Sequence, residues 1–553
     1  MTTSSDILRV IPLGGLGNIG RNMMLYEVNN ESIAVDCGLM FPEDEHLGVD
    51  VIIPDFSYLR NTETQLKALF LTHGHEDHIG AAAYLLKEFN IPVFCTKLTR
   101  GLLQVKLQEH HLSDEIKIQS LDPGSDVSIG NFNIESFQVS HSIPDSAGFI
   151  IRTSAGTIVH TGDFKIDHTP IMGQHTDLNR LAEVGNEGVL LLCADSTYAE
   201  IDGYTPSETV VAERLENAVS KAPGRIIMTT FASLISRIQI IIDAAIKFDK
   251  RIFVTGRSME KNIQISRDLG YISAPDQVFM SRKEMRSFPP HKTIIICTGS
   301  QGEPNAALSR IARGTHQYIE IQDGDTVVLS SNPVPGNEKS VSKNINLLFE
   351  AGADVIYNQI DNVHVRGHAA KEELKIIHRI IKPKNFVPIH GEFRHLVHHA
   401  QLAINLGMEP ENVFVLEDGD VLEINEDYAE IPDHISTDYI YINQYGNTEI
   451  DENIIHERQA LADNGVVVIT LLLNTEKNTL DVPLSISSYG FIPKENESEI
   501  YGNIRTFSQT LLAENQNINI QQAQMDIEKK LSQYLFQLTR RKPIVRAKIL
   551  TKT

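Results

Sequence analysis

The strongest structural signal in this chain is the segment Ala68-Leu-Phe-Leu-Thr-His-Gly-His-Glu-Asp-His-Ile-Gly80. Its apolar first part predicts a buried strand, and its end predicts the start of a helix. Alternate residues at a strand end point the same way, so His73 and His75 are placed to bind one metal ion. Asp77 and His78 then face a neighbouring position. Imidazole and carboxylate groups crowded into one short loop indicate a metal site rather than a packed or solvated turn.

More candidate ligands follow predicted strands further along the chain. They are His141 in Val-Ser-His-Ser-Ile-Pro, Asp163 in His-Thr-Gly-Asp-Phe, and His390 in Val-Pro-Ile-His-Gly-Glu. Each stands at a strand end beside a Gly, Ser or Pro turn. Together with the loop they supply enough nitrogen and oxygen ligands for two ions, and such mixed ligation suits zinc or manganese.

The rhythm of apolar segments divides the 553 residues into several domains. Residues 1–206 are rich in short strands, and 207–362 alternate regularly between strand and helix. The strand-rich style resumes over 363–430. A polar, irregular linker is expected at 431–450, and a small α+β domain at 451–553. This order predicts a parallel α/β domain inserted into a mixed-sheet sandwich.

Charge and composition limit the function. The net charge is −23, which excludes binding of nucleic acid through a global basic field. RNA binding would therefore need a local basic groove or metal ions. The four cysteines form no CxxC pair and are expected to be buried free thiols. The sequence has no run long enough to span a bilayer and starts without a signal-peptide pattern, which predicts a cytoplasmic protein with no membrane partner.

A glycine-rich segment near the start imitates a nucleotide-binding motif. Gly15-Leu-Gly-Asn-Ile-Gly20 matches GxGxxG, but a dinucleotide fold requires a helix after the glycines. Here Arg21–Val28 reads as a strand instead. We therefore expect a glycine-rich hairpin turn.

The His-Gly-His-Glu-Asp-His loop resembles the HxHxDH signature of the metallo-β-lactamase superfamily. More closely, the whole chain resembles the β-CASP nucleases and, within them, the ribonuclease J family. The motifs that carry this resemblance are Pro12-Leu-Gly-Gly-Leu-Gly-Asn-Ile-Gly-Arg-Asn22, Ala194-Asp-Ser-Thr197, Phe231-Ala-Ser233, Cys297-Thr-Gly-Ser-Gln-Gly-Glu303, Ser331-Asn-Pro-Val-Pro-Gly-Asn-Glu338, His364-Val-Arg-Gly-His368, Pro388-Ile-His-Gly-Glu392 and Arg540-Arg-Lys-Pro543.

The resemblance implies a fold and a ligand set. The fold is a metallo-β-lactamase αββα sandwich with an inserted parallel α/β domain, the β-CASP domain, and a small C-terminal α+β domain. His73, His75 and His141 would hold one ion, Asp77, His78 and His390 the other, and Asp163 would bridge two Zn²⁺ or Mn²⁺ ions. Family members with histidine at the position of His390 act on RNA, so the resemblance favours RNA as substrate.

The implied reaction is two-metal hydrolysis of a phosphodiester. We expect His368 to act as the general acid and Asp195 to order the neighbouring ligands; the opposite division of labour stays open. The resemblance implies 5′→3′ exonuclease and endonuclease activity on single-stranded RNA, in RNA maturation and decay including rRNA processing. Two alternatives remain at this point: a small-molecule hydrolase, such as a thioesterase or lactamase, and a non-catalytic RNA-binding scaffold.

A pocket for a 5′-monophosphate is a further expectation. Its candidate residues are Ser233, Leu234, Ile235, His364, Val365, Arg366, Gly367 and His368. The family pattern has Asn where this chain has Leu234, and commonly Ser where it has Arg366. These departures alter the detail of the pocket, although an arginine suits phosphate.

The resemblance also implies a calcium site and an assembly. Gly48, Asp50 and a linker position, here Asn443, would hold Ca²⁺. The family has aspartate at that linker position, so this chain loses a charge and weak affinity is expected. The implied partners are a second or further copies of the chain, as a homodimer or homotetramer, and other RNA-degradation proteins.

Overall fold

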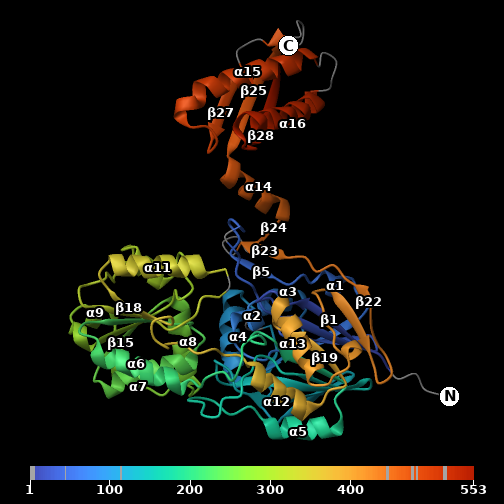
Figure 1. The fold of residues 1–553 in the computed structure, drawn as a ribbon, viewed down its shortest axis with the longest axis vertical. Helices are drawn as coiled ribbons and strands as arrows, with labels where there is room; N and C mark the ends of the chain where they lie inside the picture. Colours follow the sequence, from blue (N-terminus) through green and yellow to red (C-terminus); the bar gives the residue numbers. More distant parts are fainter. Residues whose placement is uncertain are drawn as a thin grey trace, which may run out of the picture. The chain divides into compact units, whose positions relative to one another are not determined.

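The computed structural model describes residues 6–43, 45–112, 115–334, 336–443, 448–474, 479–480, 484–514 and 520–552. The chain divides into two compact units (Figure 1). The first comprises residues 1–41 and 52–440, and the second comprises 42–51 and 441–553. Among the described residues, no helix combines the length and apolarity needed to cross a membrane.

Two β-sheets form the centre of the first unit. The eight-stranded sheet runs in the order β22 (Ala429–His434), β21 (Asp420–Ile424), β1 (Leu8–Gly14), β3 (Met23–Val28), β4 (Glu31–Val35), β6 (Gln65–Phe70), β7 (Val93–Cys95), β8 (Ile118–Ser120). The six-stranded sheet runs β19 (Asn385–Ile389), β13 (Leu191–Asp195), β12 (Gly156–His160), β11 (Ser146–Thr153), β10 (Phe132–Val139), β9 (Asp126–Ile129).

The apolar residues of the strands bury themselves between these two sheets. Phe70 from one sheet meets Phe149 from the other edge to face, with ring centroids 5.7 Å apart, and also stacks on Phe94 at 5.0 Å. Ile134 and Ile151 are fully buried in the same core. Burying one such side chain contributes roughly 1.5–3 kcal/mol, so this shared core fixes how the strand ends of the two sheets meet.

Helices complete the sandwich on its outer faces (Figure 1). Along the first part of the chain they are α1 (Ser57–Asn61), α2 (Glu76–Ile79), α3 (Ala82–Glu88), α4 (Lys97–Glu109) and α5 (Leu178–Glu187); later come α12 (Lys371–Ile381) and α13 (Phe393–Asn405). Apolar residues of α5, α12 and α13 form one core with the outer face of the six-stranded sheet, including Leu181, Ile377 and Leu402. The sandwich therefore has the αββα layers expected.

The inserted domain has a five-stranded parallel sheet in the order β15 (Arg251–Thr255), β16 (Thr293–Cys297), β14 (Ile226–Thr229), β17 (Thr326–Leu329), β18 (Asp354–Tyr357). Its helices are α6 (Thr209–Lys221), α7 (Ile235–Lys247), α8 (Arg257–Asp268), α9 (Arg282–Met285), α10 (Ala307–Ala312) and α11 (Glu338–Glu350), with short 3₁₀ turns at Asp276–Val278 and Pro290–Lys292. The chain leaves the sandwich after β13 and returns on β19, the parallel neighbour of β13. The predicted fold class is confirmed.

The glycine-rich segment is not a nucleotide-binding turn. It contains the short strand β2 (Leu16–Gly17), which pairs with β20 (Gly391–Glu392), and is followed by strand β3 rather than by a helix. The prediction of a glycine-rich turn before a strand is confirmed. Its pairing with β20 places this turn beside Gly391, the residue that follows His390.

The second unit contains β25 (Val466–Asn474) between β27 (Ser485–Tyr489) and β28 (Ile544–Lys552), with β26 (Thr479–Leu480) on the end of β25. Its helices are α14 (Glu452–Asn464), α15 (Glu497–Glu514) and α16 (Ile520–Thr539), with a 3₁₀ turn at Lys494–Asn496. Residues of α15 and α16 share one core with the strands, so helices cover one face of this sheet.

The segment 431–450, which the sequence predicts to be an irregular linker, contains strands among its described residues. Strand β22 lies partly in this range and pairs antiparallel with β21, while β23 (Ile440–Asn443) pairs with β24 (Thr448–Ile450). Strand β22 lies at a sheet edge with nearly all of its residues exposed, so it lacks the apolar alternation that reveals a strand. Backbone pairing, rather than side-chain burial, therefore holds β22, whereas Tyr441 and Ile442 of β23 are buried.

Candidate metal centre

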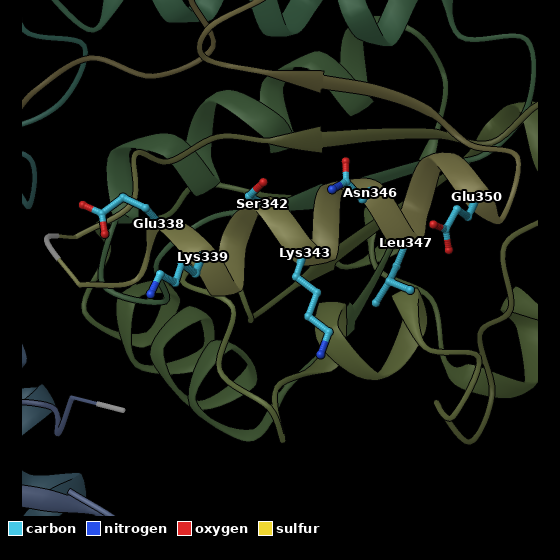
Figure 2. Close-up of a pocket in the computed structure, with 7 residues that line it drawn as sticks. All are labelled: Glu338, Lys339, Ser342, Lys343, Asn346, Leu347 and Glu350. Carbon is cyan, nitrogen blue, oxygen red and sulfur yellow. The ribbon is translucent and has the colours of Figure 1, made fainter. Parts of the chain in front are cut away.

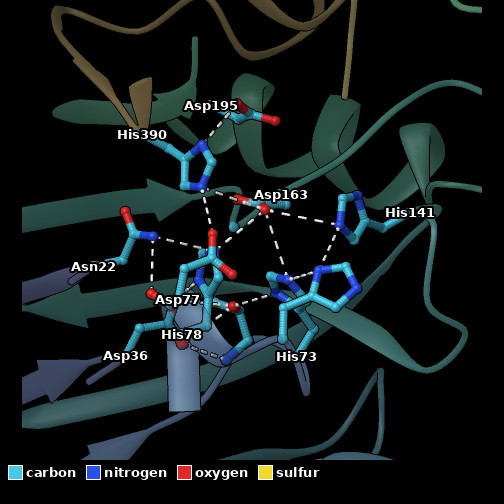
Figure 3. A network of polar contacts seen from close by, with 12 residues as sticks. Asn22, Asp36, His73, Asp77, His78, His141, Asp163, Asp195 and His390 are labelled. Carbon is cyan, nitrogen blue, oxygen red and sulfur yellow. Dashed lines mark hydrogen bonds and ion pairs between the residues drawn. The ribbon is translucent and has the colours of Figure 1, made fainter. Parts of the chain in front are cut away.

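The loop after strand β6 gathers its four side chains against residues from distant strands (Figure 3). Three groups of possible ligand atoms form, and the atoms of each group lie within 4.8 Å of one another; the third combines Asp163 and His390 with Asp195 and His368. The first contains His73, His75, His141 and Asp163; the second contains Asp77, His78, Asp163 and His390. All seven metal-ligating residues predicted from the sequence therefore lie together, and Asp163 belongs to all three groups.

One carboxylate oxygen of Asp163 lies at the centre of this cluster. Its Oδ2 lies 3.2 Å from Nε2 of His78, 3.6 Å from Nε2 of His73 and 3.6 Å from Nε2 of His390. Its other oxygen, Oδ1, is buried and has no hydrogen-bond partner within the described residues. An unpaired buried carboxylate oxygen is costly, and cations bound beside Asp163 would compensate its charge. The arrangement fits a two-metal site.

The protonation of the cluster also fits metal binding. Burial lowers the pKa of His73 and of His141 well below the usual value, and lowers the pKa of His75 to about 4. These rings are therefore neutral near pH 7 and offer a lone pair. Burial alone would raise the pKa of Asp163, but the surrounding histidines lower it further, so this carboxylate is ionised. In the second group burial is outweighed by the charge of Asp163, which raises the pKa of His78 well above its usual value and that of His390 to about 10, so these two rings would lose a proton when metal binds.

Hydrogen bonds orient the ligands of the second group. The Nδ1–H of His78 donates to Oδ2 of Asp36 at 2.8 Å, which leaves Nε2 facing Asp163. Nδ1 of His390 lies 2.6 Å from the Thr197 hydroxyl, and this hydroxyl donates to Asp195 at 2.8 Å. Each bond fixes a ring orientation and directs the free nitrogen towards the metal position.

These orienting residues were missed by the sequence reasoning. Asp36 directly follows strand β4 and has a positive φ of 62°, a conformation that a single sequence does not reveal. It also accepts a hydrogen bond from the Thr72 amide at 2.8 Å, so it anchors the start of the metal loop. Asn22 donates from Nδ2 to the Asp77 carbonyl at 2.9 Å. Thr197 stood within a recognised motif, and only its position there indicated a role.

A second titratable pair adjoins the metal centre. Nδ1 of His368 lies 2.8 Å from Oδ2 of Asp195, and Tyr198 packs edge-on against the His368 ring with centroids 5.5 Å apart. Burial lowers the pKa of His368, but the charges of Asp195 and Asp163 outweigh it, so the net shift is upward. His368 is therefore suited to carry a proton near neutral pH, with Nε2 directed away from Asp195.

The loop that contains His368 touches the first group of metal ligands. The Nδ1–H of His141 donates to the Gly367 carbonyl at 2.8 Å. From the inserted domain, the Ser236 hydroxyl donates to the Ser142 carbonyl at 3.0 Å. The start of helix α7 and the 364–368 loop therefore both adjoin the residues at 141–142, one of which is a metal ligand.

The candidate phosphate-pocket residues divide into two kinds. Leu234, Ile235 and Val365 bury their side chains, so only their backbone is available to a ligand. The polar members are Ser233, His364, Arg366 and His368, with Gly367 offering only its backbone. The Arg366 guanidinium stacks on Tyr198 at 4.7 Å, and Nδ1 of His364 is buried with no partner among the described residues.

The calcium residues lie together in the second unit. The Asp50 amide donates to the Ile442 carbonyl at 3.0 Å, next to Asn443. A guanidinium lies beside Gly48: a Cβ there would be 2.6 Å from Nη1 of Arg458. A fixed cation at this position opposes calcium binding, and the calcium site stays a prediction.

A hollow of about 580 Å³ lies elsewhere, over helix α11 (Figure 2). It is lined by Glu338, Lys339, Ser342, Lys343, Asn346, Leu347 and Glu350, all from one helix. Side chains of both charge signs along one helix face describe ordinary surface, and the chemistry gathers at Asp163 instead.

Fold and site together define a metallo-β-lactamase-type protein with an inserted β-CASP domain. Four family models match the chain: "Beta-lactamase superfamily domain" over residues 36–210, "Ribonuclease J, beta-CASP domain" over 223–348, "Zn-dependent metallo-hydrolase RNA specificity domain" over 353–416, and "Ribonuclease J C-terminal domain" over 453–551. The chain belongs to the ribonuclease J family.

Individual relatives agree with this assignment. Ribonuclease J of Helicobacter pylori (strain ATCC 700392 / 26695) is 42% identical over 92% of this chain and 74% of its own length. Ribonuclease J 1 of Streptococcus pyogenes is 40% identical over 98% of this chain and 97% of its own, and ribonuclease J2 of Bacillus subtilis is 38% identical over 98% of each. A crystal structure of an Enterococcus faecalis protein of unknown function shares the fold, with a TM-score of 0.52, 15% identity, and coverage of 76% of this chain and all of that one.

The hydrogen bond between Asp36 and His78 predicts an effect on metal affinity. Asp36→Asn removes the charge that holds the His78 ring, and metal affinity should fall about 10- to 100-fold. Titration calorimetry with Zn²⁺ on the metal-free protein measures this loss. The exposed Asp126→Asn serves as the matched control and should bind like the parent. Equal affinity in the two variants would show that Asp36 has no part in orienting the ligand.

Proposed function

We propose that this protein is a metal-dependent ribonuclease, a hydrolase that cleaves phosphodiester bonds of RNA. The observation that carries the proposal is the convergence of six candidate ligands on a seventh, Asp163, in a chain whose relatives are named ribonucleases J over nearly its whole length. His73, His75 and His141 would hold one ion and Asp77, His78 and His390 the other, with zinc or manganese in both positions.

Bound divalent cations at these positions would supply an activated water and neutralise charge on the phosphoryl group. The protein's own residues handle the leaving group. His368 carries a proton at neutral pH and passes it from Nε2 to the departing 3′-oxygen. Asp195 accepts the Nδ1–H of His368 and, through Thr197, also orients His390. It is thus a positioning residue for both rings.

The substrate we infer is single-stranded RNA with a 5′-monophosphate, degraded 5′→3′ and also cut internally, in RNA maturation and decay. Arg366 and His364 bring positive charge and imidazole donors to the loop next to His141, which supports a phosphate site there. We further infer a cytoplasmic enzyme that assembles as a homodimer or homotetramer and contacts other RNA-degradation proteins. The domain boundaries at residues 206, 362, 430 and 450 are part of this proposal.

Removal of the metal provides the first test. Dialysis against a chelator should abolish cleavage of labelled RNA, and added Zn²⁺ or Mn²⁺ should restore it in proportion to the metal bound, up to two ions per chain. The same preparations are given thioester and β-lactam substrates. Turnover of these compounds without RNA cleavage would favour the small-molecule hydrolase, and full metal occupancy without any turnover would favour the scaffold.

Loss of the general acid provides the second test. His368→Ala should keep the metal content of the parent while RNA turnover falls about 10²- to 10⁴-fold. In the parent, the rate should decline as pH rises through the raised pKa of His368, because the acid loses its proton. The variant should lack this decline. A variant with parental turnover, or with the alkaline decline intact, would assign the proton to another group.

The 5′-phosphate site is tested with Arg366→Gln. A charge-assisted hydrogen bond contributes about 1.5–3 kcal/mol, so the preference for 5′-monophosphate over 5′-hydroxyl RNA should shrink roughly 10- to 100-fold. The exposed Arg286→Gln is the matched control. Initial rates on monophosphate, triphosphate and hydroxyl substrates are compared. If the parent cleaves all three equally, this chain has no such pocket.

A further inference from the structure

Basic residues are segregated at the end of this acidic chain. Residues 529–552 contain no Asp or Glu, in a chain whose formal charge is −23. Their Lys and Arg residues are Lys529, Lys530, Arg540, Arg541, Lys542, Arg546, Lys548 and Lys552. This segment spans the second half of α16, a turn, and strand β28. It provides the local positive charge that the bulk composition lacks.

Helices α15 and α16 leave the opposite face of the C-terminal sheet largely open, although α14 contacts strand β28, where Glu457 pairs with Arg546. The helices α15 and α16 pack on the side of Val467, Ile469 and Val545. Residues that alternate with these are partly or fully exposed on the opposite side, and strand register aligns them in rows. Tyr489, Val466 and Ile544 form the row at the end next to the turn; Ser487, Val468 and Arg546 form the next; Ser485, Thr470 and Lys548 form the third.

Four cations at this face are unpaired. Arg540, Arg541 and Lys542 are exposed, and their side chains, like that of Lys548, make no hydrogen bond or ion pair with any residue that the structure describes. Arg546 differs, because Glu457 holds it at 2.9 Å. Uncompensated cations so close together repel one another, so an anionic ligand would be favoured here.

An exposed aromatic ring lies on the same face of the sheet. Tyr489 is 70% exposed and lies in the row next to the turn. Open sheet faces with an exposed ring and flanking cations suit single-stranded nucleic acid, because bases stack on the ring while Lys and Arg contact the phosphates. We propose that Arg540, Arg541, Lys542, Lys548 and Tyr489, the C-terminal basic face, bind single-stranded RNA. The proposal rests on the ribonuclease function above and adds a contact surface separate from the metal centre.

Charge favours RNA over a second copy of the chain. A two-fold contact would place the same patch on both copies opposite itself. The four unpaired cations of each copy would then face one another, which is unfavourable without compensating acidic residues. RNA, a polyanion, would neutralise these cations, whereas a second copy of the chain would add four more.

The experiment measures RNA affinity against salt concentration. Arg541→Gln/Lys542→Gln is compared with Lys494→Gln/Arg505→Gln, which removes two exposed cations elsewhere in the same unit. Both are made in a His368→Ala background, so that a 30-nucleotide RNA stays intact. Each phosphate contact contributes about 0.7 to the slope of log affinity against log salt for single strands. The Arg541→Gln/Lys542→Gln pair should make this slope less steep by about 1.4, and the Lys494→Gln/Arg505→Gln pair should leave it unchanged. Tyr489→Leu should weaken binding roughly fivefold to a hundredfold.

Two further measurements keep the outcomes distinct. With His368 intact, the Arg541→Gln/Lys542→Gln pair should hydrolyse bis(p-nitrophenyl) phosphate at the parental rate, because this small diester needs only the metal centre. Sedimentation should give the parental mass. Equal slopes for the two pairs overturn the proposal, and so does a change in mass, which would identify the face as a contact between copies. If the parent itself fails to hydrolyse either RNA or the diester, the ribonuclease proposal fails instead.

Discussion

The rest of the site depends on one buried carboxylate. Asp163 presents Oδ2 to imidazoles of the 73–78 loop, of His141 and of His390, while Oδ1 has no hydrogen-bond partner among the described residues. One carboxylate cannot pair with all of these ring nitrogens, whereas metal ions placed among them would bind both the nitrogens and the carboxylate. The ligand shell is therefore organised for metal before any metal binds. Asp36 and Thr197 contribute to this order, since each holds Nδ1 of one ring (His78 and His390) and leaves its Nε2 facing Asp163.

The point at which the middle domain is inserted also brings residues of the site together. Strands β13 and β19 are parallel neighbours, so Asp195 at the end of one lies beside His390, which follows the other. The whole inserted domain separates them in sequence. From the inserted domain, the Ser236 hydroxyl donates a hydrogen bond to the carbonyl of Ser142, the residue after His141. The candidate metal ligands, the proposed proton donor and the inserted domain thus meet at the same strand ends, which is where a substrate would contact both domains.

Sequence alone predicted the part of the site that is local. The ligands at 73–78 are close in sequence, and strand alternation was enough to group them. His141, Asp163 and His390 could be paired with that loop only through the family resemblance, because their meeting depends on sheet order. Asp36 and Thr197 escaped prediction since a hydrogen bond to the far nitrogen of a histidine leaves no sequence pattern. Strand β22 escaped for a related reason: an exposed edge strand is held by backbone pairing and has no apolar period.

The acidic composition acquires a physical meaning in this arrangement. A protein of net charge −23 repels RNA over most of its surface, so binding is confined to places where positive charge is concentrated. The metal centre is one, and the loop with Arg366 beside Tyr198 adjoins it. The 529–552 segment is another, and it is free of acidic residues in a chain where they outnumber basic ones by 72 to 49. Repulsion over the rest of the surface then favours selective binding, because an RNA strand that does not contact these positively charged regions gains no attraction elsewhere.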